Sequence, residues 1–172
     1  FNPQLKTKLP HFPFHLKIGD RTLILDYITD SECQPVMEMY NQAAHKGHGY
    51  GTDEFNSLEA FKEDFIDGAH AIVGRDAQSD QILLSFSIAP TSYCRSTNPD
   101  MADGFLLVDP ALRGRGIGTR IVQLMLRIAK DIGYRGYVTD TFLSNVPMYK
   151  VLMAAGFHVI GYAPNMAFVE GT

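Results

Sequence analysis

The sequence predicts an α/β protein in which a mixed sheet carries helices on its faces. Its 172 residues fit a single domain. Segments rich in β-branched residues and segments with helical periodicity follow one another in the order β-α-α-β-β-β-α-β-α-β-β. The chain contains no internal repeat and no low-complexity segment. This order is typical of a mixed central sheet of about seven strands flanked by about four helices.

The N-terminal third begins with a segment that contains three prolines. We expect residues 1–20 to form an extended lead-in and residues 21–172 to form the domain itself. Residues 21–28 are apolar and β-branched, which predicts a strand. A helix is expected to begin at Asp30 or Ser31. The apolar residues that then share one helical face are Val36, Met37 and Tyr40.

The middle of the chain is expected to hold a second helix and three strands. Ser57 is suited to cap a helix over residues 58–66. The strands are expected over residues 69–76, 81–90 and 104–110. A polar loop, residues 91–103, separates the last two strands, and Pro110 stops the last one.

The C-terminal third predicts two more helices and three more strands. A long helix is expected to begin near Ile117, because apolar residues recur from there at helical spacing. Asn145 opens a shorter helix, which Gly156 ends. The strands are expected over residues 134–142, 157–163 and 166–170.

The composition argues against several classes of protein. Lys and Arg number 15 against 19 Asp and Glu, a formal net charge of −4, whereas a dedicated nucleic-acid binder is basic. No apolar run approaches the ~20 residues of a membrane span, so no membrane partner is expected. Cys33 and Cys94 are too few for a four-ligand zinc site or a disulfide framework. We therefore expect a cytoplasmic or nuclear protein without a metal.

A glycine-rich turn between a strand and a helix is the most informative segment. Gly114, Gly116 and Gly118 alternate there, beside Arg113 and Arg115. Glycines let the backbone approach a ligand closely, and the first N–H groups of a helix attract anions. The turn therefore predicts a phosphate-binding site; the simpler alternative is a tight turn with solvated arginines. The Walker and dinucleotide patterns, GxxxxGK and GxGxxG, are both absent, which argues against a nucleotide or NAD.

Two segments resemble landmarks of the GCN5-related N-acetyltransferase (GNAT) superfamily. Arg113–Gly118 resembles the Gln/Arg-x-x-Gly-x-Gly/Ala loop that binds acyl-CoA in that superfamily. Asn145, followed by a helix that ends in Gly156 and Phe157, resembles the second landmark. The expected order of elements is similar to that fold from residue 21 to residue 169. The resemblance therefore covers nearly the whole chain.

The resemblance implies acetyl-CoA as the co-substrate. The pantetheine arm would pair with the backbone of Leu106, Leu107 and Val108. The amides that would cradle the pyrophosphate belong to Arg113, Gly114, Arg115, Gly116, Ile117, Gly118 and Thr119. A pyrophosphate suits a helix N-terminus because both its charge and its acceptor atoms match the free N–H groups. Asn145 would contact CoA or order a water, and it also suits the role of helix cap.

The resemblance further implies direct attack of an amine on the thioester, helped by a base and an acid. Many members carry a tyrosine acid where this chain has Leu152; Tyr149 lies one helical turn earlier, so we predict Tyr149 as the acid or, alternatively, as a packing residue. Asp103 is the first candidate for the base and Asp140 the second, although the commonest alignment would place Ala102 at that position. No base is required if a water chain reaches solvent.

The acceptor site of this superfamily is expected near the loop between the first two helices. His45 and His48 lie in that loop, and Tyr50, Glu54 and Phe55 would share its wall. A carboxylate and aromatic rings suit a small cationic or amino-acid acceptor. The alternative for the two histidines is plain solvent exposure.

The sequence thus predicts an acetyl-CoA-dependent N-acetyltransferase that acts on a small molecule or an amino acid. Two alternatives remain: an N-acetyltransferase for proteins or peptides, and a noncatalytic acyl-CoA-binding sensor. A narrower similarity links the chain to fungal acetyltransferases of proline analogues such as azetidine-2-carboxylate, which carry Asn where Asp103 and Thr139 stand here. Two chains often associate in this superfamily, which makes a homodimer the protein partner to consider.

Overall fold

Seven strands form one mixed sheet in the computed structural model, which describes residues 8–45, 54–91, 93, 100–114 and 116–163. The strands are β1 (Phe14–Ile18), β2 (Arg21–Tyr27), β3 (His70–Asp76), β4 (Ile82–Pro90), β5 (Met101–Asp103), β6 (Leu106–Val108) and β7 (Gly136–Tyr137). Their order is β1-β2-β3-β4-β5-β7, and β6 pairs with β4 off this path. The β5–β7 pair is parallel, and the other recorded pairs are antiparallel.

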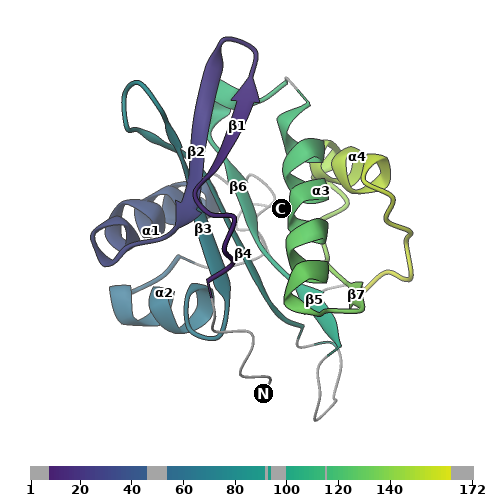
Figure 1. The fold of residues 1–172 in the computed structure, drawn as a ribbon. Coiled ribbons are helices and arrows are strands. Elements are labelled where there is room, and N and C mark those ends of the chain that lie inside the picture. The colour runs from purple at the N-terminus through teal and green to yellow at the C-terminus, as the bar shows by residue number, and fades with distance from the viewer. Residues whose placement is uncertain (1–7, 46–53, 92, 94–99, 115, 164–172) are drawn as a thin grey trace.

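Four α-helices cover the two faces of the sheet over the described residues (Figure 1). They are α1 (Asp30–His45), α2 (Leu58–Phe65), α3 (Ile117–Ile132) and α4 (Val146–Ala154). Helices α1 and α2 lie on one face, and α3 and α4 lie on the other. A short 3-10 turn, Pro110–Leu112, precedes α3. The mixed sheet with helices on both faces confirms the predicted fold class.

Two apolar clusters, one on each face, hold these layers together. Ile72 of β3 packs in the same cluster as Ile121 of α3. Its neighbours Ala71 and Val73 pack in the other cluster with Val36 of α1. Successive side chains of a strand point to opposite faces, so one strand contributes to both clusters.

The elements with strong local signals agree with the sequence predictions. Helix α1 buries the predicted face of Val36, Met37 and Tyr40. The Ser57 hydroxyl accepts a hydrogen bond from the Ala60 amide at 3.1 Å and caps α2 as expected. The apolar stripe of α3 is buried, apart from the half-buried Leu124.

Two short strands lie where the sequence predicted an extended lead-in outside the domain and a polar loop. Residues 14–18 of the expected lead-in pair with β2 as β1, because Leu16 and Ile18 alternate with polar residues and are buried in the core. Residues 101–103 of the expected polar loop form β5, whose Ala102 is fully buried. Both predictions were therefore wrong at these residues, where the pairing of a neighbouring strand decides the conformation.

The predicted C-terminal strands are mostly shorter or absent. The strand expected over residues 134–142 is reduced to Gly136–Tyr137. Residues 157–163 form no strand in the described chain. The strand expected over residues 166–170 lies outside the described residues.

Candidate active site

The sheet opens where β5 gives way to β6. Both strands pair with β4 in one continuous register, from Pro90↔Ala102 to Leu84↔Val108, but the ladder is interrupted at Gly104 and Phe105. Strand β5 has β7 on its other side, whereas β6 has no strand there among the described residues. One backbone edge of β6 therefore has no strand beside it within the described residues.

The backbone groups on this edge belong to Leu106 and Val108. The Phe105 carbonyl accepts from the Ser87 amide at 3.0 Å, and the Asp109 amide donates to the Leu83 carbonyl at 2.9 Å. Alternate residues of a strand direct their N–H and C=O groups to opposite sides, so those of Leu106 and Val108 point away from β4. We call them the open edge of β6. Leu107, also predicted to bind, instead directs its backbone toward β4.

The open edge leads directly to the N-terminus of α3. Gly114 and Gly116 adopt left-handed conformations, with φ of 79° and 68°, which explains why glycine stands at both positions. Gly116 is the N-cap of α3, and no side chain caps this end. The amides of Ile117, Gly118 and Thr119 therefore form a first helical turn without intrahelical acceptors. Such a turn attracts an anion.

The third glycine of the motif has a different role. A Cβ on Gly118 would lie 3.0 Å from Cγ2 of Val151, so glycine here lets α4 pack closely against α3. The described arginines of this region bond to backbone carbonyls: Arg113 Nε donates to Val108 at 3.3 Å and Arg120 to Lys17 at 2.9 Å. Arg115 lies outside the described residues.

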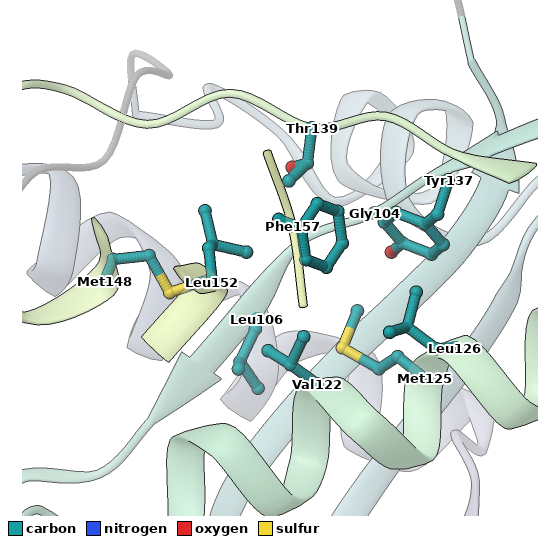
Figure 2. A pocket seen from close by; sticks show the side chains of 10 residues that line it. All are labelled: Gly104, Leu106, Val122, Met125, Leu126, Tyr137, Thr139, Met148, Leu152 and Phe157. Atoms are coloured by element: carbon teal, nitrogen blue, oxygen red, sulfur yellow. The ribbon is translucent and has the colours of Figure 1, made fainter. Parts of the chain in front are cut away.

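A cavity lies between the β6 end of the sheet, α3 and α4 (Figure 2). About 260 Å³ of space separates its lining atoms, part of it open to solvent. Its lining is Gly104, Leu106, Val122, Met125, Leu126, Tyr137, Thr139, Met148, Leu152 and Phe157. Among these lining residues, only Tyr137 and Thr139 carry a hydroxyl group, and the other side chains are apolar. We call this space the α3–α4 cavity. The sequence prediction missed Tyr137, whose place on a strand leading into the site was the available signal.

Two carboxylates, Asp103 at the end of β5 and Asp140 in the segment that follows β7, lie near the point where the sheet opens. Asp103 ends β5 and accepts a hydrogen bond from the Gly104 amide at 2.7 Å. Burial raises the pKa of Asp103, and the charge of Asp140 raises it further; hydrogen bonds from Gly104 and Thr139 lower it without cancelling the rise. The structure thus brings together both predicted bases. Ala102, the alternative position, is buried in the apolar cluster that contains Ile121 of α3, which we call the α3 cluster.

Tyr93 extends this acidic pair on the solvent side. Its hydroxyl bonds to Asp140, and burial together with the charges of Asp140 and Asp103 raises the pKa of the phenol. Two carboxylates and a phenol at one opening suit a cation with several N–H donors. We call Asp103, Asp140 and Tyr93 the acidic opening.

The two predicted residues of α4 occupy different positions. Asn145 caps α4, because its side-chain oxygen accepts from the Met148 amide at 3.2 Å, and the predicted capping role is confirmed. Tyr149 is 40% exposed and does not line the α3–α4 cavity, whereas its helix neighbours Met148 and Leu152 do. Its role as the acid stays a prediction.

The predicted acceptor wall is described only in part. His45 ends α1 and its Nδ1 lies 3.0 Å from Oε1 of Glu54, with both side chains largely exposed. The backbone of Phe55 is anchored to the Asn41 side chain by hydrogen bonds of 2.8 and 3.0 Å. His48 and Tyr50 lie outside the described residues. A second hollow lies between α1 and β6, lined by residues that include Gln42, Leu107 and Arg113.

No helix in the described part of the chain has the length and apolar character needed to cross a membrane. Within the same residues, no three His, Cys, Asp or Glu side chains gather as a metal ion would require.

Comparison with known proteins connects this geometry to a family. The model of the acetyltransferase (GNAT) family matches residues 84–157. This match confirms the resemblance seen in Arg113–Gly118 and around Asn145. The matched segment contains the open edge of β6, the N-terminus of α3, Asp103 and α4, but not α1 or α2.

Individual relatives agree with this assignment. A protein of Bacillus subtilis (strain 168), named as a candidate phosphinothricin acetyltransferase, is 33% identical over 81 residues, which are 47% of this chain and 50% of that protein. The match thus spans half the length of this curated relative. A GCN5-related N-acetyltransferase from Kribbella flavida has a TM-score of 0.72 at 22% identity, over 83% of this chain and 86% of its own.

A third relative extends the likeness in fold. A phosphinothricin acetyltransferase of the GNAT superfamily from Sinorhizobium meliloti, in complex with acetyl-CoA, has a TM-score of 0.70 at 15% identity, over 81% of this chain and 76% of its own. At these identities the solved structures show a shared fold. The described chain therefore has the GNAT fold well beyond the segment that the family model matches.

Proposed function

We propose that this protein is an acetyl-CoA-dependent N-acetyltransferase that moves an acetyl group directly to the amine of a small molecule or an amino acid. The observation that carries the proposal is the open edge of β6 running into the uncapped N-terminus of α3. An extended arm with amide groups can pair with such an edge, and a pyrophosphate suits such a helix end. Acetyl-CoA combines both parts in one molecule.

The direction of the edge supports a position for the thioester of acetyl-CoA. With the pyrophosphate at Gly116–Thr119, the pantetheine arm would run back along Val108 and Leu106 and bring the thioester to Gly104. The Leu106 amide, which points to the open edge, would donate to the carbonyl oxygen as negative charge develops there. Asn145 would contact the arm from α4 while its side-chain oxygen caps that helix.

The acidic opening would receive the amine. Asp103 and Asp140 lie where the thioester would end, and an ammonium group could bond to both carboxylates. The attacking amine must be neutral, so a base has to remove its proton. Asp103 suits this role because its raised pKa makes it a stronger base than an ordinary aspartate. The family relatives named for phosphinothricin, a small-molecule acceptor, support a small amine over a peptide.

The test is the release of CoA thiol from acetyl-CoA in the presence of pooled amino acids, polyamines or peptides. We expect one of the first two pools to stimulate release, and mass spectrometry of that pool would then identify the acetylated amine. Stimulation by peptides alone would favour the protein-directed alternative. If no pool stimulates release while acetyl-CoA still raises the Tm, the protein binds acyl-CoA without catalysis and the proposed reaction is wrong.

A further inference from the structure

Tyr137 brings a buried hydroxyl to the α3–α4 cavity. Its oxygen is inaccessible to solvent and has no hydrogen-bond partner in the described part of the chain. The ring is held by an edge-to-face contact with Phe157, with centroids 5.9 Å apart. Figure 2 shows the hydroxyl directed inward among apolar side chains. A buried donor without an acceptor is unfavourable, and a ligand atom that accepts its hydrogen bond would relieve this.

The hydroxyl lies at the point where the sheet opens. Tyr137 pairs with Ala102 as the last pair of the parallel β5–β7 ladder. A Cβ on Gly104 would lie 2.4 Å from the Tyr137 hydroxyl, so the absence of a side chain at Gly104 lets the phenol reach the strand. The open edge of β6 begins two residues later. The phenol therefore stands at the end of the path that the pantetheine arm would follow.

Tyr137 and Asp103 lie on opposite faces of the sheet. Ala102 packs in the α3 cluster, and Tyr137 packs against that same cluster from the neighbouring position of β7. Asp103 follows Ala102 in the strand and so points to the other face. An amine held at Asp103 would thus approach the thioester from the Asp103 side, while the phenol faces the α3–α4 cavity.

We propose that the Tyr137 hydroxyl donates a hydrogen bond to the thioester sulfur of bound acetyl-CoA and stabilises the thiolate as it leaves. The inference rests on the proposed function, since it needs acetyl-CoA in the open edge. The amine nitrogen forms the new C–N bond, and the π pair of the carbonyl moves to oxygen. When the carbonyl re-forms, the C–S bond breaks and its electron pair goes to sulfur. The amine proton passes to Asp103, and CoA leaves as a thiolate that takes a proton from solvent.

The phenol acts in this step as a hydrogen-bond donor that keeps its own proton. Burial, followed by the charge of Asp103 and the proximity of Tyr134, raises the pKa of Tyr137 far above that of an ordinary tyrosine. A phenol that holds its proton so tightly remains a donor over the whole working pH range. Its effect is to lower the pKa of the bound thiol, because a donated hydrogen bond favours the thiolate.

Tyr137→Phe tests the inference, because it removes the hydroxyl and keeps the ring against Phe157. The readout is the pKa of the CoA thiol in the complex, followed by thiolate absorbance in the ultraviolet and corrected with the complex of desulfo-CoA. We expect this pKa to be higher in the variant than in the wild type by about one unit, and kcat to fall roughly tenfold or more. Affinity for CoA at neutral pH should change by less than about threefold.

Tyr134→Phe is the matched control. Its hydroxyl is also buried without a partner in the described chain, and burial raises the pKa of Tyr134 to about 12, but it does not line the cavity. This variant should leave the thiol pKa and kcat at their wild-type values. A thiol pKa that is equal in Tyr137→Phe and in the wild type would overturn the inference alone, while a wild type that fails to bind CoA would overturn the proposed function with it.

A second measurement uses only the wild type, so it tests the inference even if Tyr137→Phe does not fold. The affinities of CoA and desulfo-CoA are compared as the pH rises through the ionisation of the thiol. If the phenol stabilises the thiolate, the preference for CoA grows with pH. A preference that stays flat or falls contradicts the inference, because the charged sulfur would then find no donor at its site.

Discussion

The two halves of the sheet differ in how completely their backbone is paired. Strands β2, β3 and β4 have seven to nine residues each and pair along nearly their full length. Strands β5, β6 and β7 have two or three residues each, and the ladder is interrupted between β5 and β6. The first half is a paired scaffold, while the second leaves backbone donors and acceptors that a ligand can use.

Two partly buried carboxylates show the same difference. Glu32 of α1 forms an ion pair with Arg75 of the scaffold strand β3 and also accepts hydrogen bonds from Thr29. Although burial raises the pKa of Glu32, these bonds outweigh it and leave the pKa lowered. Asp103, in the open half, has no cation as partner within the described chain, and its pKa is raised. A carboxylate that stabilises the fold is therefore paired, and the one suited to take a proton is not.

Substitution of Gly116 should give the largest effect on the open half. Gly116→Asp forces a side chain into a left-handed conformation and puts a negative charge at the N-terminus of α3, where the pyrophosphate would bind. We expect affinity for CoA, measured by calorimetry, to fall about 100-fold or more.

Gly68→Asp is the control, because Gly68 has a similar φ of 78° and equally open surroundings in the turn before β3. It should lose comparable stability and keep its affinity for CoA. Equal loss of affinity in both variants would mean that the strain acts through the whole fold and that the pyrophosphate does not bind at α3.

Removal of the Asp103 charge should give the next largest effect. Asp103→Asn is expected to lower turnover about 100-fold and to remove the rise in rate with pH that deprotonation of a base causes. The apparent pKa of that rise in the wild type should lie above that of an ordinary aspartate, because burial disfavours the charged form. Asp100→Asn, at an exposed carboxylate near the start of β5, should change neither.

Asp103→Asn should also be more stable than the wild type at neutral pH. Because the pKa of Asp103 is raised in the folded state, its contribution to stability is complete below the unfolded pKa of about 3.9 and is lost as the pH rises through the folded pKa. The gain in Tm of Asp103→Asn should thus be present at pH 7 and disappear in acid. A loss of stability at pH 7 would show that the carboxylate is structural.

Glu32→Gln tests how much the ion pair with Arg75 stabilises the scaffold. Removing the charged partner of the half-buried Arg75 is expected to lower the free energy of unfolding by about 2 kcal/mol, measured by urea denaturation. Turnover per folded molecule should not change. Glu38→Gln, on an exposed turn of the same helix, is the control and should lose less than about 0.5 kcal/mol.

The contribution of Glu32 to stability depends on pH with the opposite sign to the contribution of Asp103. The pKa of Glu32 is lowered in the folded state, so its contribution is complete above the unfolded pKa and is lost as the pH falls through the folded value. The difference between Glu32→Gln and the wild type should therefore shrink on acidification. A difference that grows in acid would contradict the stabilising role of the ion pair.

The two halves also differ in how well the sequence predicted them. The helical stripe of α3 and the β-branched run of β2 are local patterns, and both elements form where expected. The glycine-rich loop was found from its alternating glycines and its arginines, which again form a local pattern. The strands β5 and β7 were missed or misplaced because their few residues depend on partners far along the chain.

The same limit applies to the candidate site. The choice between Ala102 and Asp103 depends on which face of β5 packs on α3, and no local pattern decides that. Tyr137 gains its position from contact with Gly104, which belongs to another strand. Sequence reasoning therefore found the part of the site that binds through local backbone geometry and missed the part assembled by strand pairing.

Tyr149→Phe should give the smallest effect and sharpens the contrast with Tyr137. A tyrosine of α4 was the acid that the sequence suggested, but its side chain is 40% exposed and lies outside the lining of the cavity where the sulfur would sit. Because a proton donor must come within hydrogen-bond reach of the leaving group, we expect turnover within about twofold of the wild type. A fall of tenfold or more, with unchanged affinity for CoA, would mean that α4 moves Tyr149 to the sulfur when the cofactor binds. The leaving thiolate would then depend on a donor from α4 as well as on the phenol of β7.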